Sequence, residues 1–249
     1  MVSREEIVRI AKSEKLPLGT IEKDFVLTYT LKKIYESGLK NRLVFKGGTA
    51  LHKLYLHKRM SIDLDFTAVK PVKTNELKAV IEDREISSKA KEVNETRSST
   101  KIVLSYVSAL EYRNSIVIDI SKREKPVLKL VERKLKSPYF KEIGILTFQL
   151  EELVAEKIRA MLQRNKPRDY LDIYYILNRK NFNLKKAVEI AKKKLKASND
   201  EFDVKKAFSN LHVVRSLWEK NLKEIMPDAP NFDVIIKKLG EKFSQVGEK

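Results

Sequence analysis

The chain contains no cysteine, which excludes disulfides, thiolate chemistry and zinc–thiolate sites. It also lacks any apolar run that approaches the 18 residues of a membrane-spanning helix. The first seven residues include Glu5 and Glu6, where a secretory leader needs an apolar segment. We therefore expect a cytoplasmic protein that has no membrane partner.

Acidic residues are in the minority. The sequence has 52 Lys and Arg against 34 Asp and Glu, a formal net charge of +18, and the excess is spread over the whole chain. Such a field favours polyanions, nucleic acid and nucleotides above all, over acidic proteins or metal cations as partners. A lysine-rich surface of the kind found in thermophile proteins explains the same excess. The charge alone does not decide between these interpretations.

Apolar residues, at 42% of the chain, are ample for a hydrophobic core. Periodicity predicts helices over residues 3–12, with Ser3 and Glu6 as a capping box, and over 19–36 and 49–57. Strands are predicted at 43–45, 61–66, 101–108 and 115–120, the last two as a hairpin, and the stretch around 74–92 looks helical. Further helices are predicted over 151–164, 167–177, 183–197, 202–223 and 232–244.

These elements predict an α+β protein, in which a mixed sheet with flanking helices precedes a helical C-terminal region. We place the boundary so that residues 1–149 form the first domain with its N-terminal helices, and residues 150–249 form a helical domain. No internal repeat interrupts this order.

Two carboxylates lie two residues apart on the strand 61–66. Because side chains alternate along a strand, Asp63 and Asp65 point to one face and Leu64 to the other. Their Cα atoms are about 7 Å apart, so both carboxylates can reach one divalent ion at about 2.1 Å per oxygen. This suits Mg²⁺ or Mn²⁺. The alternative is an exposed strand edge with two solvated aspartates.

A glycine turn precedes this strand. At Gly47, Gly48 and Thr49 a strand ends and a helix begins, so backbone N–H groups and a hydroxyl converge where a triphosphate can bind. Taken alone, the pair of glycines is a common turn. Followed one short helix later by Asp63 and Asp65, it becomes a specific combination.

A third carboxylate is needed if two metal ions are held. Asp119 lies on the strand 115–120 and faces away from Ile116, Ile118 and Ile120. It is the candidate, although an aspartate that reaches water at a strand end explains the same position.

The segments 45–51 and 59–66 together resemble the first motif of the polymerase-beta-type nucleotidyltransferases, in the form used by the AbiEii family of toxin nucleotidyltransferases. The segment 22–25 and the segment from Glu156 to Tyr174 resemble further signatures of that family. The resemblance spans roughly residues 20 to 180. Where this chain has Thr49 the family most often has serine, which keeps the hydroxyl.

The resemblance implies an NTP substrate, a Mg²⁺ or Mn²⁺ cofactor bound by Asp63 and Asp65, and phosphate contacts from Gly48 and Thr49. It also implies that Lys157 contacts the triphosphate and that an acidic residue, Asp172 in preference to Asp169, completes the site. We assign Gly47, Ser61 and Arg168 to nucleotide binding as well, and Asp119 to the metal as its third ligand.

The helical segments agree in part with these roles. Lys157 and Arg164 are seven residues apart and share a helix face, and after Pro167 the residues Arg168 and Asp172 share another. The alternative is an ordinary salt-bridge network between two helices. The basic run from Lys122 to Lys136 either lines a groove for an RNA backbone or forms a solvated helix face.

We therefore expect transfer of a nucleoside monophosphate from an NTP to a hydroxyl acceptor with release of pyrophosphate. By resemblance, the acceptor is the 3′ end of a tRNA and the partner is a separate antitoxin protein. Two alternatives stay open: a nucleic-acid-binding protein without activity on the same fold, and a nucleotidyltransferase that modifies a small molecule.

Overall fold

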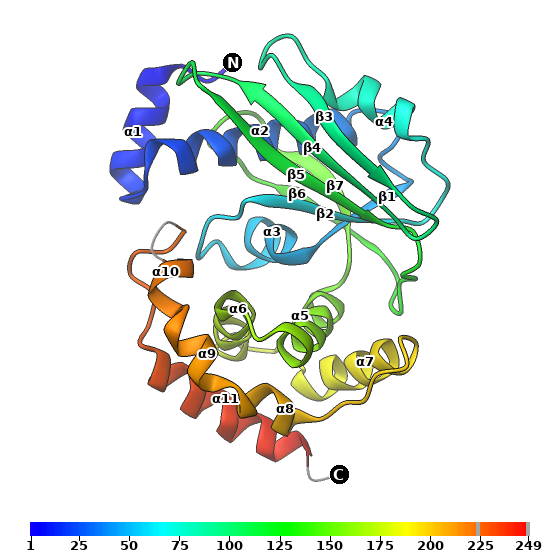
Figure 1. Ribbon diagram of the computed structural model, residues 1–249, viewed down its shortest axis with the longest axis vertical. Coiled ribbons are helices and arrows are strands. Elements are labelled where there is room, and N and C mark those ends of the chain that lie inside the picture. Colours follow the sequence, from blue (N-terminus) through cyan, green and yellow to red (C-terminus); the bar gives the residue numbers. More distant parts are fainter. Residues whose placement is uncertain (223–224, 248–249) are drawn as a thin grey trace. The chain divides into compact units, whose positions relative to one another are not determined.

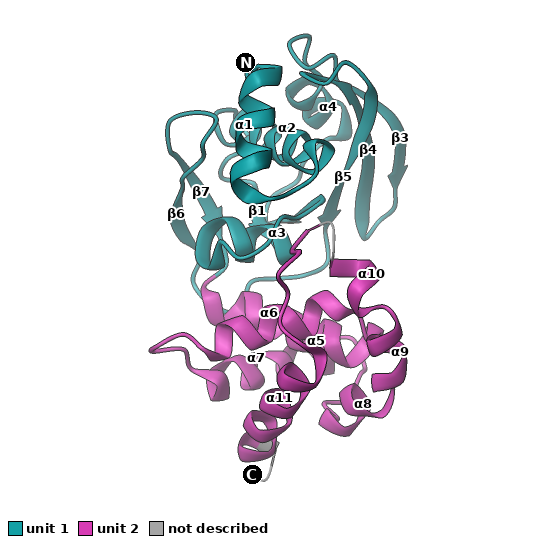
Figure 2. Ribbon diagram, turned by 90° about the vertical axis from the view of Figure 1, so that its left-hand side faces the viewer, with its two compact units in different colours: residues 1–148 teal, residues 149–249 magenta. Residues whose placement is uncertain are grey.

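The computed structural model describes residues 1–222 and 225–247. The chain divides into two compact units, residues 1–148 and 149–249, which are coloured separately in Figure 2. Within the described residues, no helix combines the length and the apolar character that a membrane span requires.

The first unit is built on a seven-stranded mixed sheet with the strand order β3-β4-β5-β2-β1-β7-β6 (Figure 1). β1 pairs antiparallel to β2 and parallel to β7, and β2 pairs parallel to β5. The remaining neighbours are antiparallel. The strands are β1 Leu43–Lys46, β2 Asp63–Ala68, β3 Lys89–Glu95, β4 Ser99–Val107, β5 Arg113–Ser121, β6 Val131–Leu135 and β7 Ile143–Thr147.

Helices cover this sheet and connect its strands. The elements are α1 Arg4–Glu14, α2 Leu18–Tyr35, α3 Gly47–Leu51, the π-helix η1 His52–Leu56 and α4 Thr74–Ile81. The predicted capping box at the start of α1 is confirmed, since the Glu6 N–H donates to Ser3 Oγ and the Ser3 N–H donates to Glu6 Oε2. Tyr35 fixes α2 to the sheet centre, because its hydroxyl accepts from the Phe45 N–H and donates to the Leu146 carbonyl.

The two faces of the sheet differ in chemistry. On β2 and β5 the residues Leu64, Phe66, Ile116, Ile118 and Ile120 are at most 2% exposed and form part of the core. The residues between them are polar or smaller and are mostly half-buried. The alternation predicted for these strands is confirmed, and it leaves a polar face on the central strands.

The second unit is helical in its described part. Its helices are α5 Leu150–Arg164, α6 Pro167–Leu177, α7 Leu184–Lys196, α8 Val204–Ser209, α9 Leu211–Ser216, α10 Trp218–Leu222 and α11 Phe232–Gly247. Pro167 opens α6 as predicted, since its missing N–H would have no intrahelical partner at that position. Lys194 of α7 bonds Glu152 and Glu156 of α5, each at 2.9 Å, and ties the two helices together.

Several predicted elements differ from the structure. The stretch 74–92 is helical only over α4, and its end belongs to the edge strand β3, whose charged residues left no apolar alternation to read. The basic run is not a helix face, because residues 131–135 form β6 and pair with β7. The helix predicted over 202–223 is three short helices, and the non-helical Asn210 separates the first two. Residue 223 lies outside the described residues.

Candidate active site

The strand β2 presents its two aspartates on the polar face of the sheet. Asp63 and Asp65 are half-buried, whereas Leu64 and Phe66 between and beyond them are fully buried. The apolar residues thus fix the rotation of the strand, because turning it over would expose them and bury two carboxylates. The predicted common face of the two aspartates is confirmed.

The register of the neighbouring strands places a third carboxylate beside them. Asp65 is opposite Asp119 of β5 in the parallel pair, and opposite Lys46 of β1 in the antiparallel pair. Asp119 is in turn opposite Lys101 of β4. Directly opposed residues point to the same face. Four adjacent strands therefore carry a row of side chains with a cation at each end and two carboxylates in the middle.

Lys46, at one end of this row, has a partner outside it. Its ammonium forms an ion pair with Glu124, which lies in the segment after β5. This ion pair fixes the 122–126 segment to the end of β1, next to Asp65. Sequence patterns alone do not indicate Lys46 or Lys101 as site residues. Lys46 adjoins the glycine turn, and Lys101 becomes recognisable once the register of the β4–β5 hairpin is assigned.

Gly47 allows the chain to turn beside Asp65. Its φ is +73°, a conformation that L-residues with side chains rarely adopt, and a Cβ at this position would lie 2.1 Å from Asp65 Oδ2. The helix α3 starts at this residue. The turn therefore requires glycine for two independent reasons, the backbone conformation and the space that the carboxylate occupies.

The hydroxyls of Thr49 and Ser61 are buried and bonded to each other at 2.5 Å. Thr49 Oγ1 also lies 2.5 Å from the carbonyl oxygen of Asp63. Both residues were predicted to bind the nucleotide. Their phosphate contacts stay a prediction, and the structure adds a second role, because these bonds brace the start of β2 against α3 and so position Asp63.

A divalent cation fits the donor chemistry of this row, since carboxylate oxygens are the ligands that Mg²⁺ and Mn²⁺ prefer. Asp63, Asp65 and Asp119 are the residues that could hold it. Over residues 1–222 and 225–247, however, no three carboxylate or imidazole groups are gathered closely enough to form a complete metal cluster. The structure thus places Asp65 directly opposite Asp119 in the sheet. The three aspartates do not converge on one metal position.

In the second unit, Lys157 of α5 lies between two buried aspartates of α6. Its Nζ is 3.1 Å from Asp169 Oδ1 and 2.9 Å from Asp172 Oδ2. Both aspartates are 0% exposed. Asp169 also accepts two bonds from the Arg164 guanidinium, at 2.8 and 2.9 Å. Since Lys157 contacts both aspartates, the preference for Asp172 over Asp169 stays a prediction.

Burial raises the pKa of Asp169, but the charges of Lys157 and Arg164 outweigh it, and the net pKa is lowered. Asp169 therefore stays ionised and holds both cations in place. The shared face that was predicted for Lys157 and Arg164 is confirmed by their common partner. Arg168 is half-buried on α6, and within the described part of the chain it is not part of this ion-pair cluster.

A mixed sheet that carries two aspartates on one strand, one short helix after a glycine turn, defines the class of nucleotidyltransferases. The family model described as the nucleotidyl transferase AbiEii toxin of type IV toxin–antitoxin systems matches residues 30–244. The chain belongs to this family and is a nucleotidyltransferase. Family membership favours the enzyme over the alternative of a nucleic-acid-binding protein without activity.

Solved structures share the fold. MenT4, a nucleotidyltransferase toxin from Mycobacterium tuberculosis, is 18% identical with a TM-score of 0.66, and the match covers 83% of this chain and 77% of that one. The protein JHP933 from Helicobacter pylori is 17% identical with a TM-score of 0.59, over 93% of this chain and 98% of that one. A search of curated protein sequences found no match.

Proposed function

We propose that the protein is a metal-dependent toxin that transfers a nucleoside monophosphate from an NTP to a hydroxyl of RNA, with the 3′ end of tRNA as acceptor. The observation that carries this proposal is the polar face of the sheet, where Asp63 and Asp65 of β2 lie beside the Gly47 turn and Asp119 of β5 is opposite Asp65. The strongly positive charge of the chain supports a polyanionic acceptor.

In the proposed reaction, the acceptor oxygen forms a bond to the α-phosphorus of the NTP. The bond from that phosphorus to the oxygen bridging to the β-phosphate breaks, the hydroxyl proton passes to solvent, and pyrophosphate leaves. Asp63, Asp65 and Asp119 would hold a divalent cation, which when bound neutralises phosphate charge and favours ionisation of the acceptor hydroxyl. Catalysis by the chain is then positioning and charge stabilisation.

Further residues serve the NTP in this proposal. Backbone N–H groups at Gly47 and Gly48 and the hydroxyls of Thr49 and Ser61 face the phosphates, by analogy with the family motif. Lys157 contacts the triphosphate, and Asp172 orients Lys157 through their 2.9 Å ion pair. Arg168 is proposed to assist in nucleotide binding. The family description further supports growth inhibition as the effect and a separate antitoxin as partner. The cytoplasm is the proposed place of action.

The test is label transfer. Purified protein is incubated with Mg²⁺, total tRNA and each radiolabelled NTP in turn, and the RNA is examined for label. We expect transfer by the wild type that stops when EDTA removes the metal. Asp63→Asn and Asp65→Asn should each lower the rate by about 100-fold or more, because charge stabilisation at the reacting phosphate is lost. Asp119→Asn tests the third ligand in the same assay.

Glu92→Gln is the matched control, since Glu92 is an exposed carboxylate of the edge strand β3 in the same sheet. It should transfer label at the wild-type rate. Equal transfer by the wild type and both aspartate variants would overturn the assignment of the site. Label that enters a small hydroxyl compound but never RNA would replace the proposed acceptor with a small molecule.

A further inference from the structure

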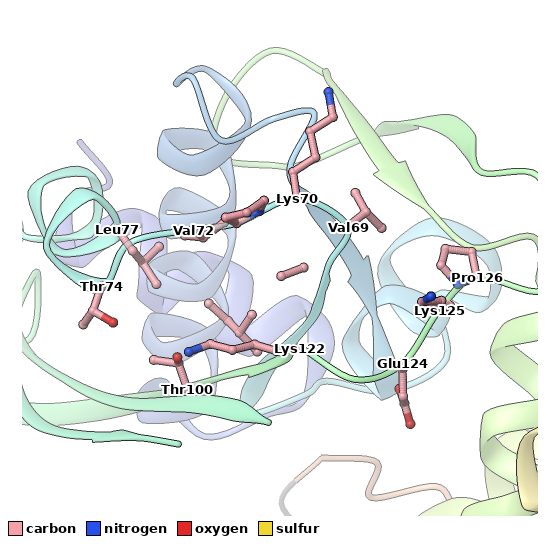
Figure 3. Close-up of a pocket in the computed structure, with 13 residues that line it drawn as sticks. Val69, Lys70, Val72, Thr74, Leu77, Thr100, Lys122, Glu124, Lys125 and Pro126 are labelled. Atoms are coloured by element: carbon pink, nitrogen blue, oxygen red, sulfur yellow. The ribbon is translucent and has the colours of Figure 1, made fainter. Parts of the chain in front are cut away.

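A hollow of about 760 Å³ lies in the first unit beyond the ends of β2 and β5 (Figure 3). The segment 69–72 after β2 and the segment 122–126 after β5 form two of its sides, and the start of α4 forms a third. β2 and β5 are adjacent parallel strands, and ligands of αβ proteins commonly bind beyond the carboxyl ends of such strands. The volume is that of a small-ligand site.

The walls of this hollow are fixed by hydrogen bonds. On one side, Arg42 donates to the carbonyl oxygen of Pro71 and pairs with Glu76 of α4. On the other side, the Lys122 N–H donates to the Ser98 carbonyl at 2.8 Å. The Lys122 ammonium lies 2.7 Å from Glu95. The hollow is therefore formed before any ligand arrives.

Its lining combines an apolar floor with cations. Leu77 and Ile120 of the floor are at most 2% exposed. Figure 3 shows the Lys122 side chain lying across the hollow toward Thr100, whereas Lys70 points away from it. Lys125 is exposed at the edge. An apolar surface suits the face of a planar base, and lysines beside it suit a phosphate.

The lining also contains a carboxylate, but it does not oppose phosphate binding. Glu124 forms an ion pair with Lys46, the residue opposite Asp65 in the sheet. The segment that borders the hollow is thus anchored beside the proposed catalytic row. Ala68, at the floor, is three residues from Asp65 along β2, which is about 10 Å.

We infer that this hollow binds one unpaired nucleotide of the acceptor RNA, with its base on the apolar floor and its phosphate toward Lys122 and Lys125. Ala68 points to the apolar face and Asp65 to the polar face, so the RNA strand passes over the ends of β2 and β5 to reach the reacting phosphate. This inference rests on the proposed function and adds to it a subsite that selects single-stranded RNA.

The test measures RNA binding without NTP, so that it is independent of transfer. The probe is a fluorescein-labelled single-stranded oligouridylate, and its anisotropy gives the Kd of the full-length protein. Ala68→Phe fills the hollow without changing charge, and Lys125→Glu reverses one charge at its edge. Each should raise the Kd by about fivefold or more. Only Lys125→Glu should also lower the slope of log K against log salt, by about 1 to 2.

The matched controls are Ala79→Phe, at an exposed position of α4 outside the lining, and Lys12→Glu, an exposed charge reversal on α1. Both should leave the preference for single strands over a duplex of equal length unchanged, and Ala68→Phe should abolish it. Thermal unfolding verifies that each variant is folded. If Ala68→Phe unfolds, crosslinking of wild type to a 4-thiouridine version of the probe replaces it, with crosslinks expected in residues 69–77 and 122–126.

Unchanged Kd values for the folded Ala68→Phe and Lys125→Glu variants, or crosslinks confined to other peptides, would overturn the subsite. A failure of label transfer to RNA together with the expected binding changes would refute the proposed reaction and leave the RNA subsite standing.

Discussion

Gly47 decides where the Asp65 carboxylate can lie. Substitution by alanine requires a side chain at a φ of +73° and places a Cβ 2.1 Å from Asp65 Oδ2. We predict that Gly47→Ala lowers the free energy of unfolding by about 1 to 2 kcal/mol, the cost of a left-handed conformation. It should also reduce label transfer by more than this loss of stability explains, because Asp65 is displaced.

Gly38 provides the control for this substitution. Among the described residues, no heavy atom outside Gly38 and its two chain neighbours lies within 4 Å of a Cβ built there, and its φ is outside the left-handed range. Gly38→Ala should therefore keep both the melting temperature and the activity of the wild type. If Gly47→Ala behaves like Gly38→Ala in thermal melts and in the transfer assay, the turn does not constrain Asp65.

At this scale the sequence was informative about Asp63, Asp65 and Gly47, because strand alternation and a glycine pair are local patterns. It was less informative about Thr49 and Ser61. Nothing local indicated that these hydroxyls bond each other across 12 positions at 2.5 Å. The row of Lys46, Asp65, Asp119 and Lys101 depends on the register of four strands, which follows from pairing between distant segments.

At the scale of elements, α2 contacts the tip of the β4–β5 hairpin through one buried carboxylate. Glu22 Oε1 accepts from the Leu110 N–H at 2.7 Å. Its Oε2 and the Tyr106 hydroxyl are buried, and neither has a hydrogen-bond partner in the part of the chain that the structure describes. Burial raises the pKa of Glu22, although the bond from Leu110 opposes that rise.

We predict that Glu22→Gln stabilises the protein at neutral pH, by about 1 kcal/mol, because it removes a buried charge and keeps the acceptor for Leu110. The raised pKa means that the folded wild type binds the proton more tightly than the unfolded chain does. The stability that the wild type gains from this tighter proton binding is present below the unfolded pKa of about 4.3 and is lost as pH rises through the folded pKa.

Thermal melts between pH 4 and 8 measure this difference. The wild type should lose stability relative to Glu22→Gln as pH rises, while Glu14→Gln, at an exposed position of α1, should follow the wild type. A Glu22→Gln protein that melts below the wild type at pH 7 would show that the ionised carboxylate is itself stabilising.

Elements with strong local signals were predictable. The capping box of α1, the β4–β5 hairpin and the start of α6 at Pro167 all follow from short-range rules. The strands β3 and β6 were missed because their residues are mostly charged and exposed, and pairing with a neighbour makes them strands. The π-helix after α3 was also missed, since no propensity distinguishes it from the predicted helix 49–57.

At the scale of the whole molecule, the second unit contains a buried carboxylate that bonds two cations. In the second unit, Asp169 is 0% exposed and is bonded to Lys157 and Arg164. We predict that Asp169→Asn destabilises this unit by about 1 to 3 kcal/mol, because Lys157 and Arg164 lose a buried carboxylate acceptor while Lys157 keeps Asp172.

Lowering the pH should likewise destabilise the second unit of the wild type. The pKa of Asp169 is lowered in the folded state, so its contribution is present above the unfolded pKa of about 3.9 and is lost as pH falls through the folded value. Hydrogen exchange of α5 and α6 peptides at pH 6 and pH 3 measures this loss. In the Asp169→Asn variant, the protection of these peptides should differ less between the two pH values than it does in the wild type.

Asp233→Asn is the control, because Asp233 forms an ion pair with Arg215 in which both side chains are more than half exposed. Its removal should cost less than about 1 kcal/mol. Similar losses for the two variants would show that burial gives Asp169 no special role.

The division into an αβ half and a helical half could be predicted from the order of the elements in the sequence, whereas the burial of Asp169 could not.

The parallel pairing of β1 with β7 has a consequence for the time at which the enzyme becomes active during synthesis. β1 and β2, which carry the glycine turn and two of the aspartates, lie between β5 and β7, and β7 ends at Thr147. Contacts between segments about 100 residues apart form late, because a long loop must close first. A nascent chain that has not yet exposed β7 therefore lacks the finished sheet that holds Asp63 and Asp65, and we expect no transferase activity until residue 147 has left the ribosome.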